Sequence, residues 1–301
     1  MDTFKSISFE EQDLFNEIFG RTKPVASEFT FAYLFMWRRD YNLSYAIIED
    51  HLCLVSQSKA YKPYSFCPIP VGGEYDPPKF YRACRWIEEY FRDMGFQPMF
   101  ARVSEGCLGR LIDVFGDRAE ITPLENTFDY VYNASDLINL PGKKYSSKRN
   151  HIHQFMRKYG EYEYVPVSEN NIQECKRIID AWADLHETNT DPDHSERYAC
   201  YELLDNWGKF QVKGALIKVN GRFEAFTIGE LLNPETAVVR IEKANAEIHG
   251  LYTLINRDFC ANEWSHVKYV NREEDLGIEG LRKSKLSYNP AFMVNKFLVK
   301  V

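Results

Sequence analysis

A chain of 301 residues exceeds the usual size of one domain, so two domains of about 150 residues each are expected. Its hydrophobic content of 45% and charged content of 27% exclude an intrinsically disordered chain. The net charge of −7 excludes a generally basic, DNA-binding surface. Residues 1–140 carry 14 Lys and Arg against 21 Asp and Glu, whereas residues 141–301 carry 23 of each, so only the second half is compatible with local basic patches.

The seven cysteines are odd in number, widely spaced and never arranged as Cys-x-x-Cys. This pattern argues against a disulfide framework and against a zinc site, so free thiols and no metal are expected. No run approaches the roughly 20 apolar residues of a membrane span. We therefore expect a cytoplasmic protein without a transmembrane segment.

The first half, residues 1–140, alternates between helical and strand periodicity. Two short apolar runs that turn at Asp50 predict a hairpin. In chain order the expected elements are helices at 8–19 and 27–38, strands at 44–49, 51–56 and 64–69, a helix at 78–94, a strand at 97–103, a helix at 105–115 and a strand near 121.

A boundary is expected around Leu140-Pro141-Gly142, where turn-forming residues separate two periodic regions. The predicted domains are therefore 1–140 and 141–301. The second domain opens with a basic helix over 143–159, in which Tyr145, Ile152 and Phe155 share one face and two lysines, at 144 and 148, share another.

The second half begins, after this helix, with helices at 172–187 and 196–207. Asn220-Gly221 is the strongest short signal for a hairpin turn, and it separates two runs with strand periodicity. The expected elements that follow are strands at 212–219, 223–232 and 236–243, a helix at 250–264, a strand at 267–270, a helix at 276–286 and a strand at 292–301.

The two halves show the same order of elements without repeating the sequence, which predicts a duplicated domain. Helix, helix, hairpin, strand, helix, strand, helix, strand is the order of the GNAT acyltransferase fold. We therefore expect an α/β protein of two tandem GNAT domains, each with a mixed sheet and helices on both faces.

Three stretches carry a closer resemblance. They are residues 140–152 leading to Phe155, residues 242–245 with 249–252, and residues 271–285 with Tyr288 and Pro290. They resemble the motifs of uncharacterised bacterial proteins built on the lysyl-phosphatidylglycerol synthase C-terminal domain, and more distantly the Fem-type aminoacyl transferases. The resemblance spans essentially the whole chain.

This resemblance implies transfer of an acyl or aminoacyl group, with aminoacyl-tRNA as a possible donor and an amine or hydroxyl as acceptor, on a small molecule or a lipid headgroup. Two alternatives stay open. One is an acyl-coenzyme A N-acyltransferase, which the turn at 244–250 disfavours, because it has one glycine where a pyrophosphate cradle is usually glycine-rich. The other is a non-catalytic GNAT module that binds an anionic ligand.

The candidate site residues come from the same three stretches. A carboxylate can accept the acceptor's proton while a cation stabilises the oxyanion, so the predicted catalytic residues are Asp275, Lys285 and Glu242. Helix-dipole and strand-end ion pairing would explain the same charges without catalysis. The basic helix at 143–159 is either an anion-binding site or a helix whose charged face is simply exposed to solvent. The predicted donor- or anion-binding residues are Lys144, Lys148, Arg149, Asn150, Lys243, Gly250, Tyr252, Asn271 and Arg282.

Overall fold

The computed structural model describes residues 4–186 and 196–301. The chain divides into two compact units. Unit 1 comprises Met1–Asp129, Glu274–Gly277 and Val294–Val301, and unit 2 comprises Tyr130–Glu273 and Ile278–Met293.

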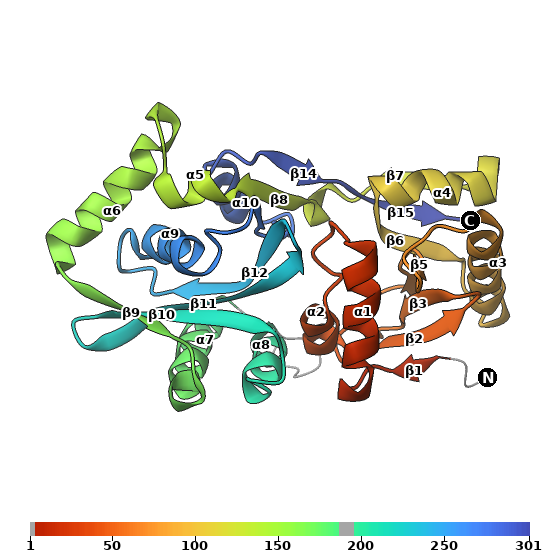
Figure 1. Cartoon of the computed structure of the whole chain (residues 1–301), viewed down its shortest axis with the longest axis horizontal. Helices are drawn as coiled ribbons and strands as arrows, with labels where there is room; N and C mark the ends of the chain where they lie inside the picture. The colour runs from red at the N-terminus through yellow and green to blue at the C-terminus, as the bar shows by residue number, and fades with distance from the viewer. Residues whose placement is uncertain (1–3, 187–195) are drawn as a thin grey trace. The chain divides into compact units, whose positions relative to one another are not determined.

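Unit 1 is built on a mixed sheet in the order β1-β2-β3-β4-β6-β15-β7, with β5 paired to β3. Its core lies between this sheet and two amphipathic helices, α3 and α4 (Figure 1). The elements are β1 (Lys5–Ser6), α1 (Gln12–Thr22), α2 (Phe31–Trp37), β2 (Leu43–Ile48), β3 (His51–Ser56), β4 (Tyr64–Ser65), β5 (Ile69–Pro70), α3 (Pro77–Asp93), β6 (Met99–Ser104), α4 (Glu105–Phe115), β7 (Glu120–Pro123) and β15 (Lys296–Lys300).

Unit 2 has a second mixed sheet, in the order β14-β8-β13-β12-β11-β10-β9. Helix α9 covers one face of this sheet, and α7 and α8 cover the other (Figure 1). The elements are β8 (Asp129–Asn133), α5 (Ala134–Asn139), α6 (Ser146–Tyr159), β9 (Tyr162–Pro166), α7 (Ile172–His186), α8 (Glu196–Asp205), β10 (Val212–Val219), β11 (Arg222–Asn233), β12 (Thr236–Ala244), α9 (Leu251–Glu263), β13 (Tyr269–Asn271), α10 (Glu279–Leu286) and β14 (Phe292–Val294).

Each of the two sheets contains one strand that comes from the other half of the sequence. In unit 2, β8 is inserted between β13 and β14, although it comes from the first half of the sequence. In unit 1, β15 from the end of the chain is inserted between β6 and β7 and is antiparallel to both. Each half of the sequence therefore supplies an interior strand to the sheet of the other half.

Most elements lie within two or three residues of their predicted bounds, and the hairpin strands β2, β3 and β10 agree closely. The predicted last strand, 292–301, is wrong as one element, because the chain leaves the unit 2 sheet after β14 and enters the unit 1 sheet as β15. The end of the predicted helix at 187 lies outside the described residues.

The units divide between Asp129 and Tyr130 rather than at 140. The Pro141-Gly142 turn lies inside unit 2, between α5 and α6, because β8 already belongs to the second sheet. The strands β8 and β9 and the helix α5 were not predicted.

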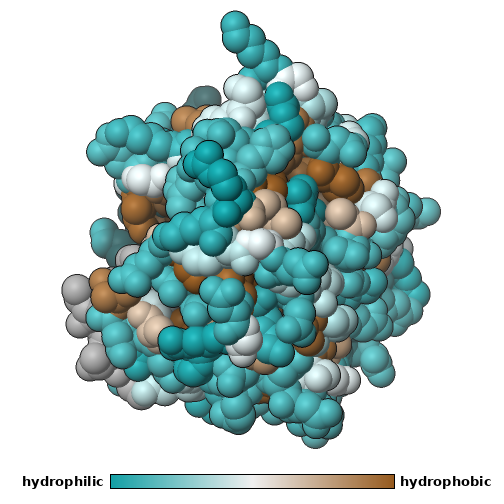
Figure 2. Space-filling model, turned by 90° about the vertical axis from the view of Figure 1, so that its left-hand side faces the viewer, coloured by the Kyte–Doolittle hydropathy of each residue, from teal (hydrophilic) through white to brown (hydrophobic). Residues whose placement is uncertain are grey.

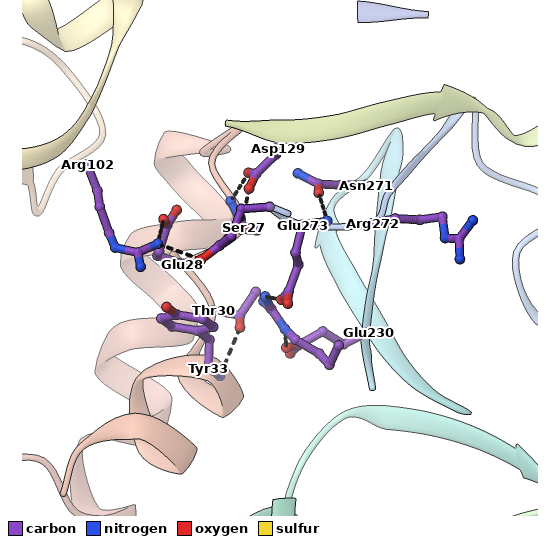
Figure 3. Close-up of polar contacts among 12 residues, drawn as sticks. Ser27, Glu28, Thr30, Tyr33, Arg102, Asp129, Glu230, Asn271, Arg272 and Glu273 are labelled. Carbon is purple, nitrogen blue, oxygen red and sulfur yellow. Dashed lines mark hydrogen bonds and ion pairs between the residues drawn. The ribbon is translucent and has the colours of Figure 1, made fainter. Parts of the chain in front are cut away.

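A buried ionic cluster holds the exchanged strand β15 in unit 1. The Lys296 side chain is fully buried, and its Nζ lies 2.6 Å from Glu28 Oε1 and 2.7 Å from Asp129 Oδ1. Ser27 donates its backbone N–H and its hydroxyl to Asp129, and Arg102 Nη1 lies 2.6 Å from Glu28 Oε1 (Figure 3). Burial alone would lower the pKa of Lys296, but the two carboxylates outweigh burial and raise that pKa.

We predict that Lys296→Met destabilises the protein by about 3–5 kcal/mol, because it removes the cation that lies between two buried carboxylates, of which only Glu28 also has Arg102 as a described cation. The control is Lys300→Met, a partly buried lysine on the same strand, which should cost much less. Urea unfolding of both variants measures the difference. Equal losses would show that β15 is held by its backbone pairing and apolar contacts and not by the cluster.

Candidate active site

The unit 2 sheet opens between β12 and β13. These two strands are parallel and pair only from Thr236 with Tyr269 to Val238 with Asn271. Beyond Val238 the described part of the sheet has no strand paired to this edge of β12, while the other edge stays paired to β11 as far as Ala244. The second half of β12 therefore borders the opening, because this edge of its backbone is not paired with a described strand.

A β-bulge in β12 determines which side chains face this opening. The register with β11 passes from Val239 to Ile241, so Arg240 is the extra residue. A bulge shifts the alternation of faces by one residue, and Glu242 therefore points to the side of the sheet that α9 covers. There its Oε2 accepts a hydrogen bond of 3.1 Å from Asn256 Nδ2 of α9.

Arg272, the first residue after β13, pairs with the same carboxylate. Its Nη2 donates to Glu242 Oε1 at 2.8 Å, and the two side chains are only 12% and 10% exposed. Burial alone would lower the pKa of Arg272, but Glu242 outweighs it and raises that pKa. Glu242 and Arg272 therefore form a partly desolvated ion pair across the opening.

Two buried polar atoms beside this pair have no hydrogen-bond partner: Arg272 Nη1 and Asn256 Oδ1. The orientation of the Asn256 amide follows from its neighbour, because the Glu242 carboxylate accepts and Nδ2 must face it. Its carbonyl oxygen is then turned away with no donor. One donor and one acceptor are thus left beside Glu242, at a cost to stability that a bound ligand would offset.

Glu242, Arg272 and Asn256 form a polar centre at this opening. Lys148 and Tyr288 complete it. The Tyr288 ring is buried, with the Arg272 guanidinium carbon 4.8 Å from its centroid and Lys148 Nζ 3.8 Å from it. Burial, with a smaller contribution from Arg272 and against the attraction of Glu242, lowers the pKa of Lys148 to about 8. The prediction that Lys148 shares a face with Lys144 is wrong, because Lys148 belongs to the buried stripe of α6 with Ile152 and Phe155.

The loop that carries Arg272 is held from two sides. Lys285 Nζ donates to the backbone oxygens of Arg272 and Glu273, at 2.6 and 3.0 Å. Arg240 binds the Glu273 carboxylate at 2.6 Å, and Asn271 Oδ1 accepts from the Glu273 backbone N–H at 2.8 Å. Figure 3 shows the Arg272 and Glu273 side chains pointing to different sides of this loop. Lys285 and Asn271, both predicted site residues, thus shape the backbone next to Arg272.

The turn before α9 is closed on itself. Glu247 N–H donates to Asn245 Oδ1 at 3.0 Å, Ile248 N–H to the Asn245 carbonyl at 3.2 Å, and Leu251 N–H to the Ile248 carbonyl at 3.1 Å. Gly250 has φ of 88°, and a Cβ there would overlap the carbonyl oxygen of His151. Helix α6 therefore packs against the start of α9, where three of the turn's amides already have partners.

The other predicted residues of α6 point outward or bind backbone. Arg149 Nη1 donates to the carbonyls of Leu140 and Gly142, at 2.5 and 2.7 Å, so it ties the preceding turn to the helix. Lys144 is half-exposed with Asp136 3.4 Å away, and Asn150 is exposed. Helix α6 lies at the left edge of Figure 1, and Figure 2 shows the molecule from that side as largely hydrophilic, with separate apolar patches.

Lys243 lies on the opposite face of the sheet from Glu242. Its Nζ is 2.8 Å from Glu196 and 3.2 Å from the centroid of the Trp182 ring, so it joins the helices on that face. Tyr252 is half-buried and packs against the apolar core of unit 2. Neither side chain has a described contact with Arg272 or Lys148.

Asp275 and Arg282 lie in different units. Asp275, in unit 1, is buried, and its Oδ1 accepts the backbone N–H of Gly277 at 2.8 Å. Arg282, in unit 2, is partly exposed on α10. Sequence reasoning did not assign a role to Arg272, Tyr288 or Asn256, although the first two stand in the stretch that carried the resemblance.

None of the described helices is both long enough and apolar enough to span a bilayer. Among residues 4–186 and 196–301, no three His, Cys, Asp or Glu side chains gather into a candidate metal site.

Comparison with known proteins shows what this chain is similar to. Residues 19–300 match the family described as "Phosphatidylglycerol lysyltransferase, C-terminal". A conserved protein of unknown function from Bacteroides thetaiotaomicron is 31% identical, with a TM-score of 0.91 and full coverage of both chains. The structure of L-PGS from Bacillus licheniformis is 13% identical, with a TM-score of 0.68, over 100% of this chain and 94% of that one. It shares the fold, which is the expected tandem GNAT-like α/β arrangement.

An uncharacterised protein of Mycoplasmoides gallisepticum is 21% identical over 183 residues. The match covers 59% of this chain and 57% of that relative, so the chain spans less than two thirds of its length.

We predict that Gly250→Ala is strongly destabilising, because a methyl group there adds a clash with the His151 carbonyl to the strain of a positive φ. Gly221→Ala is the matched control, with φ of 81° and no atom within 4 Å of the added Cβ. The control should lose about 1–2 kcal/mol from φ alone, and Gly250→Ala roughly 1–3 kcal/mol more. Thermal unfolding compares them; equal losses would mean that α6 is free to move away from α9.

Proposed function

The chain belongs to the phosphatidylglycerol lysyltransferase C-terminal family, and from that membership we propose that unit 2 transfers an aminoacyl group from an activated ester to an amine or hydroxyl acceptor. The acceptor class that fits the family is a lipid headgroup or a small molecule, and the donor is an aminoacyl-tRNA. The first half of the chain serves as a divergent copy that supports the transferase unit.

The observation that carries the proposal is the pair of unpartnered polar atoms at the opening of β12 and β13. Ester aminolysis develops negative charge on the carbonyl oxygen, and Arg272 Nη1 is a preorganised donor for it. Aminoacyl esters also carry an amino group, and Asn256 Oδ1 is an acceptor for its N–H. Glu242 fixes both side chains, so their orientation is set before the substrate binds.

The turn before α9 supports the choice of donor. A coenzyme A pyrophosphate needs free backbone N–H groups at this point, and here the amides of Glu247, Ile248 and Leu251 are hydrogen-bonded within the turn. The close packing of Gly250 on α6 leaves no room for even a methyl group. This supports an aminoacyl-tRNA donor, which does not require a pyrophosphate cradle.

Of the residues predicted from sequence, we propose that Glu242 and Lys285 act by positioning Arg272, through its side chain and its backbone respectively. The proton-accepting role predicted for Asp275 stays a prediction. Asp275→Asn tests it, because the change removes a proton acceptor and keeps the shape, so slower turnover with unchanged binding would support the role.

We predict that the purified protein transfers a radiolabelled aminoacyl group from aminoacyl-tRNA, and that Arg272→Lys lowers kcat by about 10²–10³-fold. Lysine keeps a positive charge near Glu242 but lacks the second guanidinium nitrogen that is free for the oxyanion. Lys283→Ala, an exposed lysine on α10, is the control and should be as active as the unmodified protein. Activity of Arg272→Lys equal to that of the control would contradict the assignment.

We further predict that acetyl-coenzyme A binds with a Kd above roughly 100 μM, or weaker than about −5.5 kcal/mol. Isothermal titration calorimetry measures this directly. Micromolar affinity for acetyl-coenzyme A would contradict the proposal of an aminoacyl-tRNA donor and support an acyl-coenzyme A N-acyltransferase instead. A non-catalytic module would bind a ligand at this site but release no free tRNA.

A further inference from the structure

Lys148 occupies a core position of an amphipathic helix. Tyr145, Lys148, Ile152 and Phe155 follow one another at spacings of three and four residues, and all four are buried. Only 8% of Lys148 is exposed. Lysine is almost never buried to this degree unless an anion compensates its charge.

No described carboxylate contacts the Lys148 ammonium directly. Lys148 Nζ makes no hydrogen bond or ion pair with residues 4–186 or 196–301, and its described contact is the face of the Tyr288 ring. The Arg272 guanidinium lies over the same ring, so a second cation competes for the same π-electrons. The nearby Glu242 carboxylate already binds Arg272 and Asn256. The surroundings thus disfavour an ammonium group at this position.

The charges around Lys148 act in the same direction. Burial is the largest cause that lowers its pKa, to about 8, Arg272 lowers it further, and Glu242 opposes them. Along α6, Arg149 follows Lys148 directly and donates to the carbonyls of Leu140 and Gly142, and His151 lies one turn on, with its ring centroid 4.8 Å from that of His249. At pH 7 about one Lys148 in ten is then a neutral amine, against fewer than about one in a thousand for an ordinary lysine.

We propose that Lys148 is the proton acceptor of the transfer reaction, a role that rests on the proposed function. It lies with Arg272 over one aromatic ring, so an acceptor that attacks a carbonyl held by Arg272 Nη1 is within the reach of the lysine amine. A neutral amine without a hydrogen-bond donor has its lone pair available for that proton.

The step balances without a further reactant. The acceptor's nitrogen or oxygen forms a bond to the ester carbonyl carbon, the carbonyl π pair moves onto its oxygen beside Arg272, and the acceptor's proton passes to the Lys148 amine. When the intermediate collapses, the bond from that carbon to the leaving oxygen breaks. The leaving oxygen takes the proton from the Lys148 ammonium, and the lysine returns to its neutral form.

The first experiment needs no substrate. The full-length protein is labelled with a trace of acetic anhydride from pH 6 to 11, and mass spectrometry follows Lys148 and Lys158 separately. Lys148 should show half-maximal reactivity near pH 8, and Lys158, exposed at the end of α6, is the internal control for the labelling. A Lys148 that titrates together with Lys158 would overturn the role, whatever the activity of the protein.

The second experiment compares a variant that keeps the charge of Lys148 with one that removes it. Lys148→Arg keeps a cation but cannot lose its proton, so kcat should fall by about 10²–10⁴-fold with little change in KM. Lys148→Met should lose as much, and both should lose the rise of rate with pH up to about 8. Lys158→Arg is the control. If Lys148→Arg keeps the activity, the lysine only holds an anionic substrate, and the proposal is wrong.

Failure of this role and failure of the proposed function are distinguishable. Turnover that survives in Lys148→Arg overturns the role and leaves the function standing. No turnover by the unmodified protein with any aminoacyl-tRNA overturns the function, and the catalytic role with it, even where labelling has shown a lysine that titrates near pH 8.

Discussion

The limited pairing of β12 with β13 is the constraint on which the site depends. A parallel ladder that continued past Val238 would occupy the edge of β12 with backbone hydrogen bonds. Because it stops, the residue after β13 is a free loop position, and its arginine can turn across the opening to the carboxylate of Glu242. The site depends equally on the bulge at Arg240, since the bulge turns Glu242 toward α9 and Arg272.

The exchanged strands explain why this opening is held in place. β13 is paired on one edge with β12 and on the other with β8, a strand that comes from the first half of the chain. The return strand β15 is an interior strand of the other sheet, where a buried lysine joins three carboxylates from distant parts of the sequence. Breaking a buried pair of this kind costs far more than breaking a surface pair, so the ends of the duplicated halves are fixed by charge as well as by backbone pairing.

Much of this was readable from sequence, because hydrophobic period and turn chemistry act locally. The Asn220-Gly221 turn predicted the hairpin of β10 and β11, and the alternation in the second half predicted β12. The family resemblance was also right. The bulge at Arg240 was not predictable, since almost every residue of this nine-residue strand is buried and the shift of faces therefore leaves no mark in the apolar pattern. Neither was the exchange of β8 and β15, because short strands do not encode which sheet they join.

Two site residues did leave a signal that the sequence analysis passed over. Lys148 falls at the i+3 position from Tyr145 and the i−4 position from Ile152, so the stripe that predicts burial of the aromatic residues also predicts burial of the lysine. Arg272 stands nine positions after the end of α9, as Arg102 does after the end of α3, and both arginines bind a buried carboxylate. Each half therefore has an arginine at the same sequence distance from the end of a helix, inside β6 in one half and directly after β13 in the other.

The net charge of the polar centre determines whether it stabilises the ground state or the transition state. In the ammonium form of Lys148, which predominates at pH 7, two cations face one carboxylate, and the centre favours an anion. In the neutral form, which is the one that can accept a proton, Glu242 and Arg272 cancel, and the centre matches an uncharged ester. Positive charge then appears on Lys148 only when a proton arrives, at the same moment as negative charge develops on the carbonyl oxygen. Stabilisation that arises only in the transition state raises kcat. Equal stabilisation of the ground state and the transition state would leave kcat unchanged.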